Sequence, residues 1–386
     1  MPIVDENKLK SLLIEGAITA LTLDTNVFDG KKLNFRSRTL KAVAGLQNRP
    51  FQLVLSGTIK REIQGHIAEA MEVALRELKK AAGDALYAFG TSSPTRGELL
   101  EQVTGGRTPS DAAATRMDEF IKDSGCEVLD DTSLVTVGSI FDAYFDQTAP
   151  FSQSKKTEFP DALALQALER TATDRKTGFL VVSKDGDWKK FCEQSQSLYL
   201  VETVETALSL INNAPPVLRK AVATWLWDDE GSQAEIVQEI SNYLERVDVD
   251  AGANASYGQV EAYGMAPELK SVGWPDRSEL EILETNQAPD GGVEVLVSIP
   301  LSLGLEIHVE LSFSVWDSVD KESLGMGGRT VIVEQEEYAP VTITVLLRNV
   351  GETNQEVELV ETELDIGSIQ VDLGDVDVFE PDDYED

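Results

Sequence analysis

The chain has 386 residues, 42% of them hydrophobic, and a formal net charge of −35 at pH 7. This length predicts two domains with substantial cores. Only two cysteines and two histidines are present, which excludes a disulfide framework, a thiolate zinc site and catalysis by several histidines. No apolar run approaches the length of a membrane span, and the first ten residues lack the pattern of a secretory signal. We therefore expect a cytoplasmic protein that does not enter a membrane.

The acidic charge is concentrated in the second half of the chain. Residues 1–210 hold 25 of the 33 basic residues and 30 of the 68 acidic residues, a net charge of −5. The remaining 176 residues hold 8 basic and 38 acidic residues, a net charge of −30. The first half can approach a polyanion through local basic patches, whereas the second half repels one.

Strand and helix patterns alternate along the first 210 residues. Short apolar runs predict strands at 18–23, 51–55, 127–129, 178–183 and 198–201. Helical spacing predicts helices at 33–46, 56–80, 109–125, 133–145, 161–171 and 188–192, and a last one that ends near 212. The glycine- and proline-rich stretch 90–110 predicts a mobile insertion. This alternation favours an α/β domain with a largely parallel sheet.

A different pattern follows the breaker at residues 212–216. Two amphipathic helices are predicted at 217–227 and 234–247, and a loop or linker at 248–258. Period-two alternation at 293–299, 306–313, 330–334, 341–348 and 356–364 predicts a mainly antiparallel β domain, with a hairpin or loop at Gly325–Gly328. The last 15 residues contain eight acids and predict a disordered tail. We therefore expect domains at 1–212 and 217–371 and an acidic disordered tail at 372–386.

Four acidic residues stand at the ends of predicted elements in the first domain: Asp24, Glu62, Asp161 and Asp185. Asp24 and Asp185 follow apolar strands, so a parallel sheet places both at its carboxyl edge, where such sheets bind ligands. Carboxylates brought together there provide oxygen ligands for Mg²⁺ or Mn²⁺. Each residue also has a purely structural explanation as a helix cap, a turn residue or a solvated helix acid. His66, one helical turn after Glu62, is more simply a structural histidine.

The segment 21–28, Leu-Thr-Leu-Asp-Thr-Asn-Val-Phe, resembles the opening motif of PIN domains. The order Glu62, Asp161 and Ser183-Lys184-Asp185 also matches that family, and the resemblance covers about residues 18–208. It implies a three-layer α/β/α fold and a metal-dependent nuclease. Asp24, Asp161 and Asp185 are then implied as metal ligands, Glu62 completes the acidic pocket, and Asp187 serves a second cation. Asn26 orients Asp24 or a substrate phosphate, and Glu158 faces the pocket. The chain departs from the pattern by its insertion at 81–125 and by Lys184.

The implied reaction is hydrolysis of phosphodiester bonds by metal-activated water, with single-stranded RNA the favoured substrate. The implied enzyme is thus an endoribonuclease, in a setting such as a toxin or phage defence. A basic rim of Lys31, Lys32, Lys60, Lys156 and Lys184 would let a polyanion approach the carboxylates. The sequence shows no compact aromatic group for base stacking.

Two alternatives stay open: a non-catalytic PIN-like scaffold and an α/β phosphohydrolase acting on a small phosphate ester. We expect the acidic β domain to bind a basic protein partner or, through its tail, to restrain the nuclease. PIN domains commonly form homodimers, which we expect here too.

Overall fold

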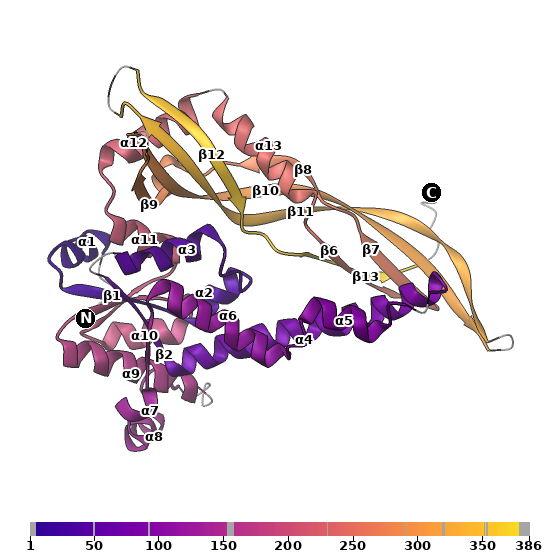
Figure 1. The fold of residues 1–386 in the computed structure, drawn as a ribbon, viewed down its shortest axis with the longest axis horizontal. Helices are drawn as coiled ribbons and strands as arrows, with labels where there is room; N and C mark the ends of the chain where they lie inside the picture. Colours follow the sequence, from indigo (N-terminus) through magenta and orange to yellow (C-terminus); the bar gives the residue numbers. More distant parts are fainter. Residues whose placement is uncertain are drawn as a thin grey trace, which may run out of the picture. The chain divides into compact units, whose positions relative to one another are not determined.

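The computed structural model describes residues 5–48, 51–91, 93–152, 158–229, 231–289, 291–318, 321–350, 352 and 354–377. The chain separates into two compact units, Met1–Asn213 and Ala214–Asp386. The described residues contain no helix long and apolar enough to cross a bilayer. Within the described residues, the first unit has one sheet, whereas the second has a six-stranded sheet and a two-stranded sheet of β6 and β13 (Figure 1).

A five-stranded parallel sheet forms the centre of the first unit, with the order β3-β2-β1-β4-β5. Its strands are β1 (Ile18–Leu23), β2 (Gln52–Ser56), β3 (Glu127–Leu129), β4 (Gly178–Val182) and β5 (Leu198–Val201). The apolar runs of β1 and β4 are almost completely buried, as expected for strands covered on both faces. The strand order reverses between β1 and β4, so the switch point of the sheet lies beyond their carboxyl ends.

Helices flank this sheet, as the alternating pattern predicted. Helix α9 packs against β2 and β4, and α11 packs against β4 and β5. The helices are α1 (Glu6–Ile14), α2 (Thr25–Gly30), α3 (Arg38–Gly45), α4 (Gly57–Ala88), α5 (Arg96–Thr104), α6 (Pro109–Ser124), α7 (Asp131–Leu134), α8 (Val137–Asp146), α9 (Phe159–Arg175), α10 (Gly186–Gln194) and α11 (Val204–Asn212).

The insertion at 90–110 is more regular than its composition predicted. Helix α5 occupies residues 96–104 and begins with a capping box, in which Thr95 and Glu98 each accept a hydrogen bond from the other's backbone N–H. This box satisfies N–H groups that a helix start leaves open, so a nine-residue helix fits between the glycines. Residues 96–104 are therefore helical, which the sequence pattern did not predict; the mobility of the insertion stays a prediction.

The second unit is a mainly antiparallel sheet covered by two helices, α12 (Pro216–Asp228) and α13 (Ser232–Leu244). The long strands β10 (Val293–Asp317) and β11 (Glu322–Arg348) pair along their length, and the sheet order is β12-β11-β10-β7 with β8 and β9 also on β10. The other strands are β6 (Val249–Ala255), β7 (Gln259–Gly264), β8 (Glu268–Gly273), β9 (Glu281–Gln287), β12 (Glu356–Leu364) and β13 (Ile369–Val376).

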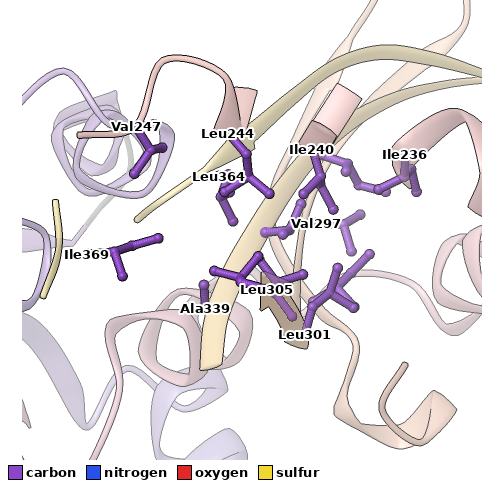
Figure 2. Close-up of a cluster of buried hydrophobic side chains, with 14 of the residues drawn as sticks. Ile236, Ile240, Leu244, Val247, Val297, Leu301, Leu305, Ala339, Leu364 and Ile369 are labelled. Carbon is purple, nitrogen blue, oxygen red and sulfur yellow. The ribbon is translucent and has the colours of Figure 1, made fainter. Parts of the chain in front are cut away.

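The core of this unit lies between the sheet and its covering helices. Ile236, Ile240 and Leu244 recur every four residues along α13 and pack with Val297 and Leu301 of β10, among others (Figure 2). This spacing places the three side chains on one helix face, and every second residue of β10 faces them. The helical spacing of α13 and the period-two alternation of β10 thus place their apolar side chains in one layer.

Several boundaries in the second unit differ from the sequence predictions. The two segments predicted as strands at 293–299 and 306–313 form one strand. Pro300 does not interrupt it, because it lies opposite Pro340 and at the place where the strand on the other side of β10 changes from β9 to β8. A proline there has less need of the N–H that it lacks.

Two more predictions of loops were wrong in this unit. Residues 249–255 of the predicted linker form β6, which pairs in parallel with β13. Gly325–Gly328 lies inside β11, and a Cβ at Gly328 would come within 2.5 Å of the Leu311 carbonyl oxygen, so this close approach requires glycine.

The acidic tail begins later than predicted. Residues 372–376 belong to β13, where Val371 and Val376 are buried in the core of the unit, so their strand pairing outweighs the acidic composition. Residues 378–386 of the predicted tail lie outside the described residues.

Candidate active site

Asp24 lies at the switch point of the parallel sheet, directly after β1. Its backbone N–H donates to the carbonyl of Val182 at the end of β4, 3.0 Å away, which fixes the two strand ends side by side. Its side chain is 6% exposed. The carboxylate oxygen Oδ2 accepts hydrogen bonds from the Ser183 hydroxyl and from the Asn26 amide, both at 2.5 Å. The Asn26 amide is thus a hydrogen-bond partner of the Asp24 carboxylate.

The other acidic residues lie close enough to Asp24 to change its pKa. Burial is the main cause that raises the pKa of Asp24; the Ser183 hydrogen bond lowers it and the negative charges of Asp161 and Asp185 raise it, and together these effects bring the pKa to about 6. Burial also raises the pKa of Glu62, followed by the charge of Asp161. Asp161 is therefore an electrostatic neighbour of both Asp24 and Glu62. Asp161 and Asp185 thus lie near enough to Asp24, and Asp161 near enough to Glu62, for their charges to act on these carboxyl groups.

Two side chains that the sequence did not single out hold these carboxylates in place. The indole Nε1 of Trp188, which is 1% exposed, donates to Oδ1 of Asp161 at 3.0 Å. The Thr25 hydroxyl donates to Oε2 of Glu62 at 3.0 Å. The only sequence signal for Trp188 is a large aromatic residue in the otherwise polar segment 186–190, whereas Thr25 is part of the opening motif.

Asp185 and Asp187 have structural partners of their own. Asp185 caps α10, because its Oδ1 accepts the N–H of Asp187 at 2.6 Å and that of Trp188 at 3.3 Å. Asp187 is 2% exposed, and its Oδ1 accepts from the Lys190 ammonium at 2.9 Å. The neighbouring positive charge makes Asp187 a weaker candidate for a cation ligand than Asp185, whose charge acts on Asp24.

Glu158, a predicted site residue, and His66, predicted to be structural, each have an environment of their own. Glu158 is half-buried and precedes the first residue of α9, without a side-chain cap hydrogen bond to that helix. His66 is exposed, and its Nδ1 lies 2.9 Å from Oδ1 of Asp29, so it belongs to a surface pair. This agrees with its structural interpretation.

The basic rim is only partly present. Lys31 is buried, and its ammonium lies 2.7 Å from Oε1 of Glu205 on α11, so it is not available to a ligand. The prediction for Lys31 was wrong because sequence proximity to Asp24 does not show that the side chain turns toward α11. Lys60 lies 2.9 Å from Asp118 and is partly exposed. Lys32 and Lys184 are exposed, and Lys156 lies outside the described residues.

The donor set fits a hard divalent cation in its chemistry. Asp24, Asp161, Asp185 and Glu62 offer carboxylate oxygens, and the pKa values of Asp24 and Glu62 are raised mainly by burial and in smaller part by the charge of Asp161, which a cation would offset. Within the described part of the chain, however, no group of three or more acidic, histidine or cysteine side chains is arranged to hold a metal ion. The carboxylates therefore suit a cation in their charge and in the type of ligand atom. Their positions, however, are set by hydrogen bonds from protein donors and not by a shared metal-binding arrangement.

The first unit is a parallel α/β fold with acidic residues at the carboxyl edge of its sheet. The PIN domain family matches residues 21–188, which include all four carboxylates and end at Trp188. The first unit therefore contains a PIN domain, and proteins with this domain are generally nucleases that depend on Mg²⁺ or Mn²⁺. No curated protein sequence matches the chain.

Proposed function

We propose that the first unit hydrolyses phosphodiester bonds in single-stranded RNA. One observation carries the proposal: Asp161 acts electrostatically on both Asp24 and Glu62, and Asp185 acts on Asp24, at the switch point of a PIN-domain sheet. The preference for RNA over DNA rests on what PIN domains usually cut.

Asp24, Asp161 and Asp185 would hold a divalent cation, with Glu62 completing the negative pocket. When bound, Mg²⁺ or Mn²⁺ would activate water and stabilise charge on the phosphate. Ser183, Asn26 and Trp188 orient the carboxylates through hydrogen bonds, a supporting role that commonly changes metal affinity or activity by about 10- to 100-fold. Lys32 and Lys184 are exposed and would contact phosphates without reading sequence.

Labelled single-stranded RNA and DNA, incubated with the full chain in Mn²⁺, Mg²⁺ or EDTA, test the proposal. Asp24→Asn and Asp161→Asn should each lower cleavage by at least about 100-fold, because they remove a ligand and not only its support. Asp84→Asn is a matched control, because Asp84 is exposed on α4. Calorimetric titration with Mn²⁺ gives a second readout, in which both site variants should bind more weakly than Asp84→Asn. RNA cleavage that persists in EDTA or in both site variants would contradict the proposal.

One observation favours the second candidate, a PIN-like scaffold that binds nucleic acid without cutting it. One carboxylate oxygen each of Asp161 and Asp185, Oδ1, already accepts a protein hydrogen bond, and Asp187 is paired with Lys190. Binding of RNA without Mn²⁺ binding and without cleavage would select this candidate.

The second unit supports a basic protein partner. Glu306 lies directly opposite Glu334 on one side and opposite Glu268 on the other, and like charges in these positions destabilise a sheet. Lys270 lies 2.9 Å from both Glu268 and Glu306, and Nε2 of His308 lies 3.1 Å from Oε1 of Glu306, so this repulsion is offset within the chain and the pKa of Glu306 is lowered. We propose that lysine and arginine side chains of a partner bind the unit through the excess of acidic residues in the second half of the sequence.

A further inference from the structure

Five aromatic rings form a cluster beside the start of α9, and we call it the aromatic platform: Phe141, Tyr144, Phe145, Phe151 and Phe159. They come from α8, from the segment after it and from the first residue of α9. The Phe141–Phe145 and Tyr144–Phe159 ring pairs are close to parallel, at 29° and 25° with centroids 6.2 and 5.4 Å apart. Edge-on contacts of Phe151 with Tyr144 and Phe159 join the rings into one group.

The platform is anchored on its inner side and open on its outer side. Phe151 is 3% exposed and packs with Ile140 and Ala162. Phe141 is 46% exposed, Phe145 72% and Phe159 38%. Single exposed apolar side chains scattered over a surface are normal. Three large aromatic side chains gathered in one exposed patch are instead a recognised sign of a binding site.

The platform and the proposed active site share the first turn of α9. Phe159 and Asp161 are both in the first turn of α9, about 3 Å apart along the helix axis. Ala162, the residue after Asp161, packs in the same small core as Phe151. Phe159 and Asp161 are two residues apart, about 200° around the helix, so the platform and the carboxylate lie on opposite sides of the start of α9.

We infer that the aromatic platform binds single-stranded nucleic acid by stacking against its unpaired bases. The strand bound there is the substrate whose backbone is cleaved at the proposed active site. This inference rests on the proposed function and adds that the substrate is held by its bases as well as its phosphates. Every base has a π face, so such stacking tolerates any sequence. It requires unpaired bases, which selects single strands over duplexes.

The charges around the platform do not favour a polyanion. Asp142 and Asp146, on α8, are exposed and follow Phe141 and Phe145 by one residue each. One residue is about 100° around a helix, so these carboxylates flank one side of the rings. They repel nearby phosphates, so any affinity for a strand here has to come from stacking of its bases and not from charge.

The test compares two oligoribonucleotides of about twelve residues in EDTA, one with normal bases and one with abasic sites throughout. Both carry the same phosphates, so a purely electrostatic surface binds them equally. By fluorescence anisotropy, the full chain should bind the base-containing strand at least about 5-fold more tightly, since one stacked base contributes about 5- to 150-fold. Equal affinity for the two strands would overturn the inference without reliance on any variant.

Variants at the most exposed ring identify the platform as the source of the preference. Phe145→Ala should weaken binding of the base-containing strand by about 5- to 150-fold and leave the abasic strand unaffected. Phe145→Trp should retain binding because it keeps a π face, whereas Phe145→Leu should lose most of it although it stays apolar. Val137→Ala is the matched control, because Val137 is 74% exposed on the same helix and has no ring.

Two further measurements separate this inference from its alternatives. If Phe145→Ala lowers the molar mass in sedimentation and leaves RNA binding unchanged, the platform joins two copies of this chain and the inference is wrong. Cleavage in Mn²⁺ is measured on the same samples. Cleavage together with base-independent binding overturns the platform alone, whereas base-dependent binding through Phe145 without cleavage keeps the platform and removes the catalytic function.

Discussion

Asp24→Asn should abolish cleavage and at the same time stabilise the folded chain. The carboxylate of Asp24 is buried beside Asp161 and Asp185, and its pKa rises to about 6 from the ordinary value of 3.8. The folded state therefore binds the proton of Asp24 more tightly than the unfolded state does. Each pKa unit corresponds to about 1.4 kcal/mol, so holding Asp24 ionised at pH 7 lowers the free energy of unfolding by about 3 kcal/mol.

The sign of the pH dependence follows from the raised pKa. Below the ordinary pKa the proton is bound in both states and Asp24 has no such cost. As the pH rises through 4 to 6 the unfolded state releases its proton first, and the stability of the folded state falls. The amide of the Asp24→Asn variant carries no charge, so its stabilisation relative to the natural chain should be about 2 to 3 kcal/mol at pH 7 and about half of that at pH 5.

Urea unfolding of both chains in EDTA at pH 5, 6 and 7 measures this difference. Asp84→Asn, on the exposed surface of α4, should show no such change and serves as the control. A variant that is no more stable than the natural chain at pH 7 would refute the reasoning, as would a stability difference that stays constant over this pH range. A stabilised and inactive Asp24→Asn would show that the carboxylate is kept for chemistry at a cost in stability.

Three other perturbations separate structural from functional acids and bases. Asp131→Asn should lower the free energy of unfolding by about 2 kcal/mol, because the buried Asp131 carboxylate accepts hydrogen bonds from Ser56, Gly57 and Thr58 at the start of α4. Urea unfolding measures this change, and an unchanged free energy of unfolding would contradict the prediction. Lys31→Met should cost about 3 kcal/mol by leaving Glu205 as an unpaired buried charge, and the double variant with Glu205→Leu should recover most of it in the same assay. Deleting residues 378–386 keeps β13 and should increase RNA cleavage at low salt but not at high salt if the acidic tail restrains the nuclease; equal cleavage at low salt would remove that hypothesis. Deleting 372–386 should instead also lower the melting temperature, because it removes Val376 from the core.

The sequence by itself determined the α/β class of the first unit and the four carboxylates of its candidate site. Strands such as β1 and β4 are short, continuous and apolar because both faces are buried, and this leaves a clear signal. Asp24 and Asp185 follow those strands directly, so the parallel arrangement alone brings them to one edge. Boundaries set by local chemistry, such as the serine cap at the start of α4 and the glycine at the end of α6, were equally readable.

Only the tertiary structure decided where the side chains point and what covers them. Lys31 follows the opening motif in sequence, yet its ammonium turns to Glu205 on α11, the last helix of the unit. Trp188 became a support for Asp161, and five aromatic residues spread over 141–159 became one platform, through contacts that have no sequence period. In the second unit, β10 and β11 continue past prolines and glycines, although such residues usually end strands. They do so because the two strands pair with each other along their length. Local patterns record the backbone and its burial, whereas pairing across the fold depends on distances that only the packed chain sets.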